Sequence, residues 1–168
     1  MSTMSKVQDL FDRANPVRAM WDRLSAVPGG RTLFSKAIGL MAPYTGTIKP
    51  QVTEVREGYA RVEMEERRKV RNHLGSVHAM ALTNLGEITS GLAVLYGLPS
   101  DVRGIVTAFE IDYEKKARGR LVAESDAVLP PLTEEREVAV PYTIRDSDDD
   151  VVARGESTWL LDPQSSQP

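Results

Sequence analysis

A single carboxylate, Glu87, stands in the middle of an otherwise uncharged, largely apolar segment between His78 and Asp101. Ionising a buried carboxylate is costly, so its pKa rises unless it is hydrogen-bonded or paired. Such a group suits general-base or nucleophilic chemistry, which makes Glu87 the first catalytic candidate. The alternative is a structural role, in which Glu87 faces a wet groove or pairs with an arginine.

A second group of candidates precedes this segment, between Asn72 and Met80. His78 stands where a helix would begin, which places the backbone amide of Ala79 in the first helical turn. Free N–H groups and the positive end of the helix dipole stabilise an oxyanion there. Each side chain also has a structural alternative: His78 as a hydrogen bond that fastens the loop to the sheet, and Asn72 as a turn residue at a strand end.

The elements that must position these residues follow from hydrophobic periodicity. Helical spacing over residues 4–26 and 33–41 predicts two N-terminal helices, the first kinked or divided at Pro16 and the second stopped by Pro43. Alternation over residues 48–65, with Gly58 at the turn, predicts a hairpin. The segment from Met80 to Gly97 predicts a buried central helix, because Glu87 argues against a membrane span.

Four strand-like runs follow the central helix, at residues 105–113, 121–129, 138–144 and 151–161. Strict alternation would place the following residues of the first run on one face: Ile105, Thr107, Phe109, Ile111 and Tyr113. Consecutive strands favour an antiparallel sheet, and a single apolar helix must be wrapped by it or by a partner chain. We therefore predict an α+β protein with accessory helices over residues 1–44, a sheet-and-helix domain over residues 45–162, and a disordered tail over residues 163–168.

The element order and the spacing of Asn72, Gly75, His78 and Glu87 resemble the hotdog-fold thioesterases, particularly the phenylacetate-degradation type. The chain is also similar to a bacterial hotdog branch of unassigned function that shares the N-terminal helices. The resemblance covers about residues 45 to 162. It implies a hotdog fold, hydrolysis of an acyl-CoA thioester, and a site built across a dimer interface.

The sequence departs from that family pattern at three places. Ala79 and Met80 stand where the family usually has a glycine pair, and the acid is Glu87 where many members have Asp. A hotdog branch that does use Glu carries Thr one turn later, where this chain has Gly91 with Ser90 adjacent. Thr107 on the facing strand is a possible substitute, or simply a strand former. The expected substrate-binding residues are Gly75, Met80, Ser90 and Thr107.

Helical geometry separates two of the candidates within one chain. His78 and Glu87 are nine residues apart, which on a regular helix means about 180° and about 13 Å. One thioester carbonyl cannot reach both, whereas antiparallel central helices in a two-fold dimer could bring them together. In the mechanism we infer, Ala79 N–H polarises the carbonyl while the partner's Glu87 acts as general base on water, or as nucleophile through an anhydride. Asn72 and His78 would position the water, the carboxylate or the loop.

Two clusters of basic residues could hold the phosphates of coenzyme A. One runs over residues 67–71, and the other contains Lys115, Lys116 and Arg118 together with Arg120. The alternative is that both are solvated strand ends. Coenzyme A would enter as part of the substrate, and we expect no further cofactor.

Composition limits the other possibilities. The 168 residues fit one domain, and 21 Lys and Arg against 24 Asp and Glu create no field that favours nucleic acid. The absence of Cys and the presence of only two His exclude a thiolate nucleophile and make a metal site unexpected. Residues 1–13 lack the apolar run of a signal peptide, so we expect a cytoplasmic protein without membrane contact, as a homodimer or dimer of dimers.

The leading function is therefore acyl-CoA thioester hydrolysis. The first alternative is a non-catalytic acyl-CoA or fatty-acyl binding or regulatory protein, which the Ala79 and Met80 departure favours. A hotdog dehydratase is disfavoured, because that chemistry usually pairs an acid with a His about one turn away on one helix.

Overall fold

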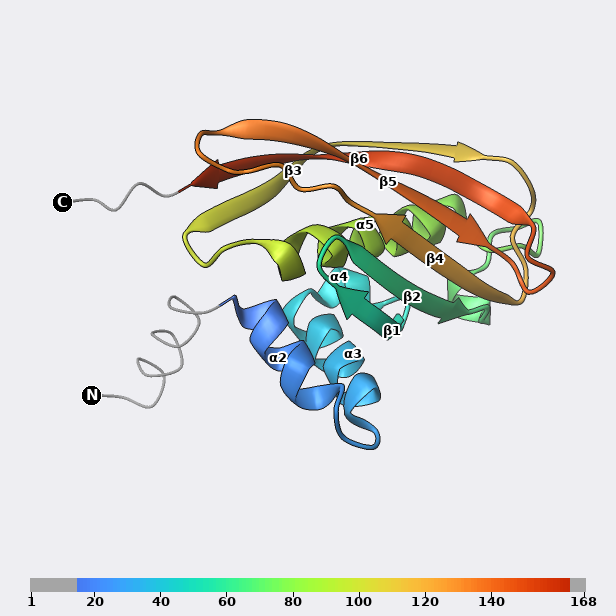
Figure 1. Ribbon diagram of the computed structural model, residues 1–168. Helices are drawn as coiled ribbons and strands as arrows, with labels where there is room; N and C mark the ends of the chain where they lie inside the picture. Colours follow the sequence, from blue (N-terminus) through green and yellow to red (C-terminus); the bar gives the residue numbers. More distant parts are fainter. Residues whose placement is uncertain (1–14, 164–168) are drawn as a thin grey trace.

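An antiparallel sheet curves around the central helix α5 in the computed structural model, which describes residues 15–163 (Figure 1). The elements in chain order are α2 (Pro16–Leu24), α3 (Gly30–Met41), α4 (Pro43–Gly46), β1 (Gln51–Arg56), β2 (Tyr59–Glu65), the 3-10 turn η1 (Arg68–Val70), α5 (Ala79–Gly97), β3 (Val102–Tyr113), β4 (Arg120–Asp126), β5 (Arg136–Arg145) and β6 (Val151–Pro163). The strand order is β1-β2-β4-β5-β6-β3, so β1 and β3 form the two edges. The predicted α+β class, the hairpin over β1 and β2, and the central helix are confirmed.

The central helix α5 is apolar because the sheet covers most of it. Leu85, Leu92 and Val94 are almost completely buried. At Gly86 the ring of Tyr142 on β5 packs so closely that a Cβ would lie 2.4 Å from a ring carbon. Only glycine permits this approach, and it fixes how α5 is rotated against the sheet.

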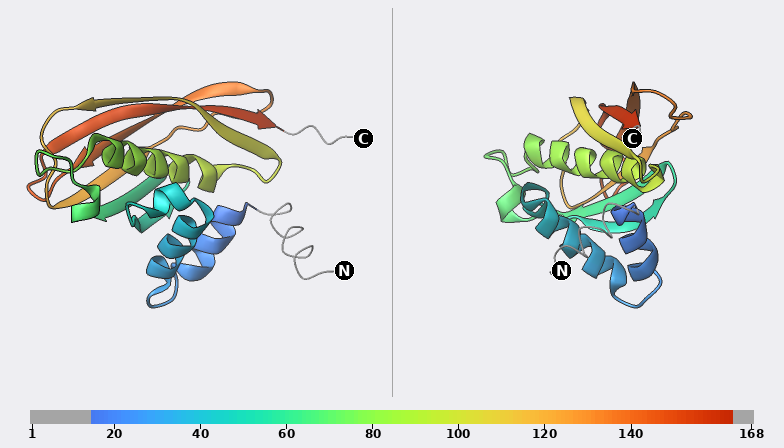
Figure 2. Two further views of the ribbon diagram at one scale, coloured as in Figure 1. Left: turned by 180° about the vertical axis from the view of Figure 1, so that it is seen from behind. Right: turned by 90° about the vertical axis from the view of Figure 1, so that its left-hand side faces the viewer.

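The N-terminal helices lie on the side of α5 away from β3, β5 and β6, as the two views in Figure 2 show. Asn15 joins the two parts: its Oδ1 accepts the amide of Arg18 at the start of α2, and its Nδ2 donates to carbonyls at the end of α5, at 2.5 Å from Leu95 O and 2.9 Å from Leu98 O. Both helix ends thereby gain partners for backbone groups that a helix leaves free. The rings of Trp21 and Phe34 meet edge to face at 5.0 Å.

Several sequence expectations about the helices need adjustment. Helix α2 begins at Pro16, in the first position, where proline is favoured. The expected helical residues before Asn15 lie outside the described residues. Of the tail expected over residues 163–168, Pro163 is the last residue of β6, and residues 164–168 lie outside the described residues. A further short helix, α4, begins at Pro43, where we predicted only a stop, so the predicted domain boundary at residue 44 falls within it.

Strand β3 does not keep the single face that strict alternation predicts. Its register against β6 shifts between Val106 and Ala108, so one extra residue is inserted and the alternation reverses. Val106 and Phe109 are partly buried, whereas Ile105 is 63% exposed and Thr107 is exposed. The expectation that Ile105 and Thr107 share a face with Phe109 is therefore wrong.

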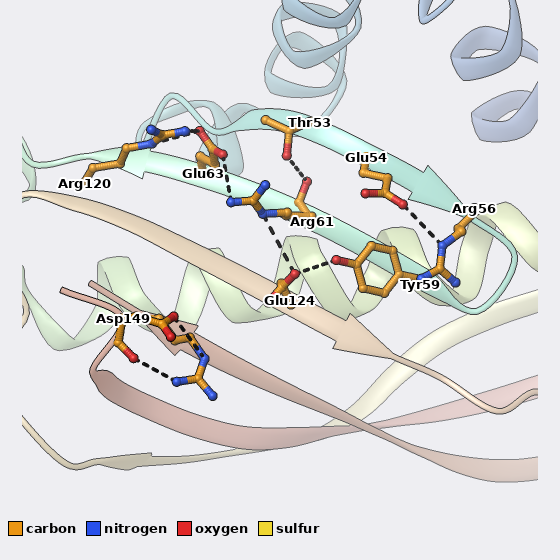
Figure 3. A network of polar contacts seen from close by, with 10 residues as sticks. Thr53, Glu54, Arg56, Tyr59, Arg61, Glu63, Arg120, Glu124 and Asp149 are labelled. Carbon is orange, nitrogen blue, oxygen red and sulfur yellow. Dashed lines mark hydrogen bonds and ion pairs between the residues drawn. The ribbon is translucent and has the colours of Figure 1, made fainter. Parts of the chain in front are cut away.

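A ladder of polar contacts covers part of β1, β2 and β4 (Figure 3). Arg120 binds the carboxylate of Glu63, Arg61 lies 3.5 Å from Glu63 and 3.9 Å from Glu124, and the hydroxyl of Tyr59 donates to Glu124 at 2.5 Å. Burial and the bond to Glu124 raise the pKa of Tyr59 to about 12. These contacts join the side chains of β2 and β4 on one surface of the sheet.

Along residues 15–163, no helix combines the length and apolar character needed to cross a membrane.

Candidate active site

Glu87 lies in a pocket of about 360 Å³ between α5, β3 and α4. Met80, Thr83 and Glu87 form a stripe at helical spacing along one face of α5. Val106 and Phe109 of β3 form the opposite wall, and Phe109 is stacked on Tyr142 at 5.1 Å. The remaining lining residues are Tyr44 and Asn84. The pocket is therefore mainly apolar, with one carboxylate.

The carboxylate of Glu87 has neither an ion pair nor a hydrogen bond to any group in residues 15–163. Burial raises the pKa of this carboxyl above its usual range, and desolvation is the sole cause. The pairing of Glu87 with an arginine, which the sequence left open, does not occur within the described chain. A carboxylate of this kind accepts protons more readily than one in water, as a general base requires.

His78 is the N-cap residue directly before helix α5. Its Nδ1 accepts the backbone amide of Met80 at 3.0 Å, so this side chain satisfies one of the free amides of the first turn. The amide of Ala79 has no acceptor in the described chain. Ala79 N–H is thus the donor at this helix end that remains free for a ligand, while His78 orders the turn that presents it.

Asn72 closes the loop before α5 on itself. Its Oδ1 accepts the amides of Leu74 at 2.9 Å and Ser76 at 3.2 Å, and its Nδ2 donates to Ser76 Oγ at 3.0 Å. Gly75 stands in the same loop with a φ of 68°, a conformation that glycine adopts without strain. Both residues shape the loop, and neither lines the Glu87 pocket.

The side chains of Ser90 and Thr107 also lie outside the pocket lining. Ser90 is fully buried, and its hydroxyl donates back to the carbonyls of Gly86 at 2.9 Å and Glu87 at 3.2 Å. Thr107 sits at the register shift of β3, where its hydroxyl lies 3.4 Å from a Glu137 carboxylate oxygen. Of the four expected substrate-binding residues, only Met80 lines the pocket, with 51% of its surface exposed.

Sequence reasoning missed five residues that line the pocket: Tyr44, Thr83, Asn84, Val106 and Phe109. Tyr44 lines the pocket from α4, and its carbonyl accepts Asn84 Nδ2 at 3.1 Å. Thr83 and Tyr113 tie α5 to β3: their hydroxyls are 3.0 Å apart, and Thr83 donates to Ala79 O at 3.1 Å. Helical spacing from Glu87 could have found Thr83 and Asn84. No local signal connects Tyr44 to Glu87, because they are 43 residues apart.

The two chemically useful groups remain separated within one chain. Ala79 and Glu87 are eight residues apart in the same helix, which corresponds to about 12 Å. Residues 15–163 hold no group of three or more His, Asp or Glu side chains that could bind a metal ion. What the chain offers is a desolvated carboxylate at mid-helix and a free amide at the helix start.

The basic residues near the start of α5 differ in how much charge they leave free. Lys115 Nζ lies 2.8 Å from Asp146 and 2.5 Å from Asp150, and its bond to Asp146 holds the pKa of that carboxyl below its usual range. Lys116 and Arg118 are exposed and make no ion pair within residues 15–163. Asp146 and Asp150, which lie between β5 and β6, therefore offset the charge of Lys115. Arg118 helps to lower the pKa of Glu66, and Lys116 has no ion-pair partner among the described residues.

The arrangement of one curved antiparallel sheet around a central helix is the hotdog fold. The chain belongs to the family described as a domain of unknown function (DUF4442), which matches residues 30–161. No curated protein matches the sequence.

Solved structures share this fold. A structural-genomics target, APC5556, is 33% identical, with a TM-score of 0.77 over 88% of this chain and 98% of that chain. A mutant of a thioesterase from Staphylococcus aureus is 15% identical, with a TM-score of 0.65 over 72% of this chain and 99% of that chain. A thioesterase from Haemophilus influenzae is 10% identical, with a TM-score of 0.67 over 79% of this chain and 92% of that chain.

Proposed function

We propose that this protein is an acyl-CoA thioesterase whose site combines Glu87 of one subunit with the N-terminus of α5 of the other. The observation that carries the proposal is the unpaired, desolvated carboxylate of Glu87 in a mainly apolar pocket. The thioesterase names of solved structures with the same fold support the reaction class.

Hydrolysis follows from these groups in two steps. Glu87 takes a proton from water as the water oxygen attacks the thioester carbonyl carbon. The oxyanion that forms accepts Ala79 N–H of the other subunit. Collapse of the tetrahedral intermediate breaks the C–S bond, and the proton returns from Glu87 to the leaving thiolate. The alternative route, direct attack by Glu87, forms a mixed anhydride that water then hydrolyses.

Strand β3 supports the two-subunit arrangement. It is an edge strand of 12 residues that pairs, within residues 15–163, with β6 alone, and it exposes Ile105 and Tyr113 by 63% and 48%. A long edge of this kind is a template for pairing with another chain. Because Val106 and Phe109 of the same strand line the Glu87 pocket, a second copy at this edge would bring its α5 N-terminus towards that pocket.

Different parts of the site suit the acyl group and the coenzyme A group of the substrate. The apolar walls formed by Tyr44, Val106 and Phe109 suit an acyl group. The exposed positive charges of Lys116 and Arg118 suit the phosphates of coenzyme A. Lys115 contributes less, because two carboxylates already neutralise it.

The test is Ala79→Pro, assayed with a panel of acyl-CoA thioesters. Proline is tolerated in the first helical position, and His78 has the extended backbone that proline requires of its predecessor (φ -67°, ψ 140°), so the change deletes only the N–H. We expect turnover to fall about 10²- to 10³-fold, as for loss of one oxyanion donor. Ala79→Ser, which keeps the amide, is the matched control and should retain most activity.

The alternative function is acyl-CoA binding without turnover, which the Met80 side chain in the pocket favours. Saturable binding of acyl-CoA by the wild-type protein, with no hydrolysis of any thioester in the panel, would establish this alternative and overturn the thioesterase proposal.

A further inference from the structure

A larger hollow of about 710 Å³, about twice the volume of the Glu87 pocket, lies between α3, α4 and the start of β1. Small-molecule sites typically measure about 300 to 1,000 Å³ and are mostly apolar with a few polar groups. Leu40 and Pro43 form apolar surface here, and Gly39 and Gly46 let the two helices approach closely. We call this hollow the α3–α4 groove.

The charges around the α3–α4 groove are of one sign. Lys36 and Lys49 line it, no Asp or Glu does, and neither lysine has an ion-pair partner in the described chain. The backbone holds Lys49 in place: it has a φ of 51°, and its amide donates to Gly46 O at 3.1 Å. An anion is therefore the ligand that this rim would stabilise.

The groove adjoins a second hollow of about 490 Å³, with which it shares Lys49 and Gln51. Arg67 lines that second hollow. Its Nη2 donates to Thr47 O at 3.1 Å, but its Nε is buried and has no acceptor. A buried N–H without a partner is rare in folded proteins and calls for a missing acceptor.

Two carboxylates also line the second hollow. Glu63 forms ion pairs with Arg120 and Arg61, and Glu65 is exposed. The acceptor missing at Arg67 is therefore supplied neither by these carboxylates nor by any other described group.

We propose that the α3–α4 groove binds an amphipathic carboxylate, such as a free fatty acid. The alkyl chain would lie against Leu40 and Pro43, and the carboxylate would face Lys49, where the groove adjoins the hollow that Arg67 lines. A purely polar anion would leave the apolar walls unused, and an amphipathic cation would meet only like charges. This proposal concerns binding and is independent of hydrolysis at Glu87.

Helix α4 lines both the α3–α4 groove and the Glu87 pocket, so it connects a ligand in the groove to the pocket. Pro43 and Gly46 line the groove, whereas Tyr44 of the same four-residue helix lines the Glu87 pocket. A ligand that fixes α4 would also fix the Tyr44 wall, because Asn84 already holds the Tyr44 carbonyl. This consequence rests on the proposed function: a fatty acid, the product class of the reaction, would then modulate its own formation.

Binding of decanoate to the full-length protein, measured by titration calorimetry, tests the proposal. Leu40→Asp places a carboxylate in the groove, and because Leu40 is 81% exposed the fold should survive. Leu33→Asp is the matched control, since Leu33 is 56% exposed on the same helix but does not line the groove. Lys49→Gln removes a rim charge, and Lys69→Gln is its control.

We expect Leu40→Asp and Lys49→Gln each to weaken decanoate binding at least about tenfold, with both controls within twofold of wild type. Decyltrimethylammonium should not bind. The groove is overturned if wild type shows no saturable decanoate binding, or if Leu40→Asp and Leu33→Asp behave alike.

Glu87→Gln separates this proposal from the thioesterase. It should leave decanoate binding unchanged whatever it does to hydrolysis, so either proposal can fail alone. Loss of decanoate binding in Glu87→Gln, with Leu40→Asp unaffected, would place the ligand in the Glu87 pocket and overturn the groove.

Discussion

Replacing Glu87 by Gln tests two consequences of its buried position, one for the reaction rate and one for the free energy of unfolding. Glutamine has nearly the same shape and cannot act as a base. Because no described group bonds to the Glu87 carboxylate, the substitution breaks no ion pair or hydrogen bond within residues 15–163. Activity and stability should therefore move in opposite directions.

The effect on rate follows from the role as general base. Such a base contributes about 10²- to 10⁴-fold. At about 1.36 kcal/mol per tenfold, this corresponds to about 2.7 to 5.4 kcal/mol of activation free energy. We expect kcat for the best acyl-CoA to fall at least about 10²-fold in Glu87→Gln.

The effect on stability follows from linkage. Burial raises the pKa of Glu87 in the folded protein, so the folded state holds this proton more tightly than the unfolded state. The wild-type free energy of unfolding therefore decreases as the pH rises from the unfolded pKa through the folded pKa. Glu87→Gln lacks this loss, so it should be more stable than wild type at neutral pH. The gain should shrink as the pH falls through the folded pKa towards the unfolded pKa, and it should vanish below the unfolded pKa.

Two measurements check these expectations: initial rates of thiol release, and urea unfolding from pH 4 to 8. The change in the variant-minus-wild-type unfolding free energy between the acidic and neutral plateaus gives the pKa shift, at about 1.4 kcal/mol per unit. Glu57→Gln, at an exposed carboxylate beside the β1–β2 turn, is the control and should leave rate and stability within about 0.5 kcal/mol of wild type.

Two results would refute the reasoning. Unchanged turnover in Glu87→Gln would remove the carboxylate from the mechanism. A lower stability of Glu87→Gln at neutral pH would mean that the ionised carboxylate has a stabilising partner, so that desolvation does not dominate its environment.

Three further predictions test the two-subunit site, the acyl pocket and the phosphate contacts. Mixing Ala79→Pro with Glu87→Gln chains under subunit exchange should restore up to half of wild-type activity per mixed dimer, because one of its two sites is intact; mixed dimers confirmed by mass spectrometry without activity would exclude a shared site. Tyr44→Ala should lower KM for bulky acyl groups relative to short ones, since Tyr44 walls the pocket, and an equal effect on all acyl lengths would contradict this role. Lys116→Glu with Arg118→Glu should raise KM for acyl-CoA at least about tenfold more than for the matching acyl-pantetheine, and this difference should shrink in high salt; equal changes for both substrates would show that these residues do not bind the phosphates.

Local pattern was sufficient for most of the fold. Alternation from Tyr59 to Glu65 predicts a strand, and the apolar run from Met80 to Gly97 predicts a helix, because each element must present its apolar residues to one core. The same pattern singles out Glu87, since a charge within an apolar helix is visible in the sequence. The roles of the residues around Glu87 do not follow from this pattern.

Strand β3 shows where local pattern is insufficient. Ile105, Thr107 and Phe109 are all good strand formers, and their spacing fits a single face equally well on paper. Pairing with β6, about fifty residues later, inserts the register shift that turns Phe109 into the pocket and Thr107 out of it. Register is set by the partner strand, which local periodicity does not record.

The sequence by itself determined that a lone carboxylate would lie on a buried helix, and that a free amide would lie at that helix's start. Only the tertiary structure decided that Tyr44 walls the pocket, that Asn72 closes its own loop, and that Lys115 is neutralised by Asp146. The physical reason is that hydrophobic periodicity, and the burial that it predicts, depend on residues that are close together in the sequence. Contacts between distant segments depend on how the sheet and helices pack, which no single segment encodes.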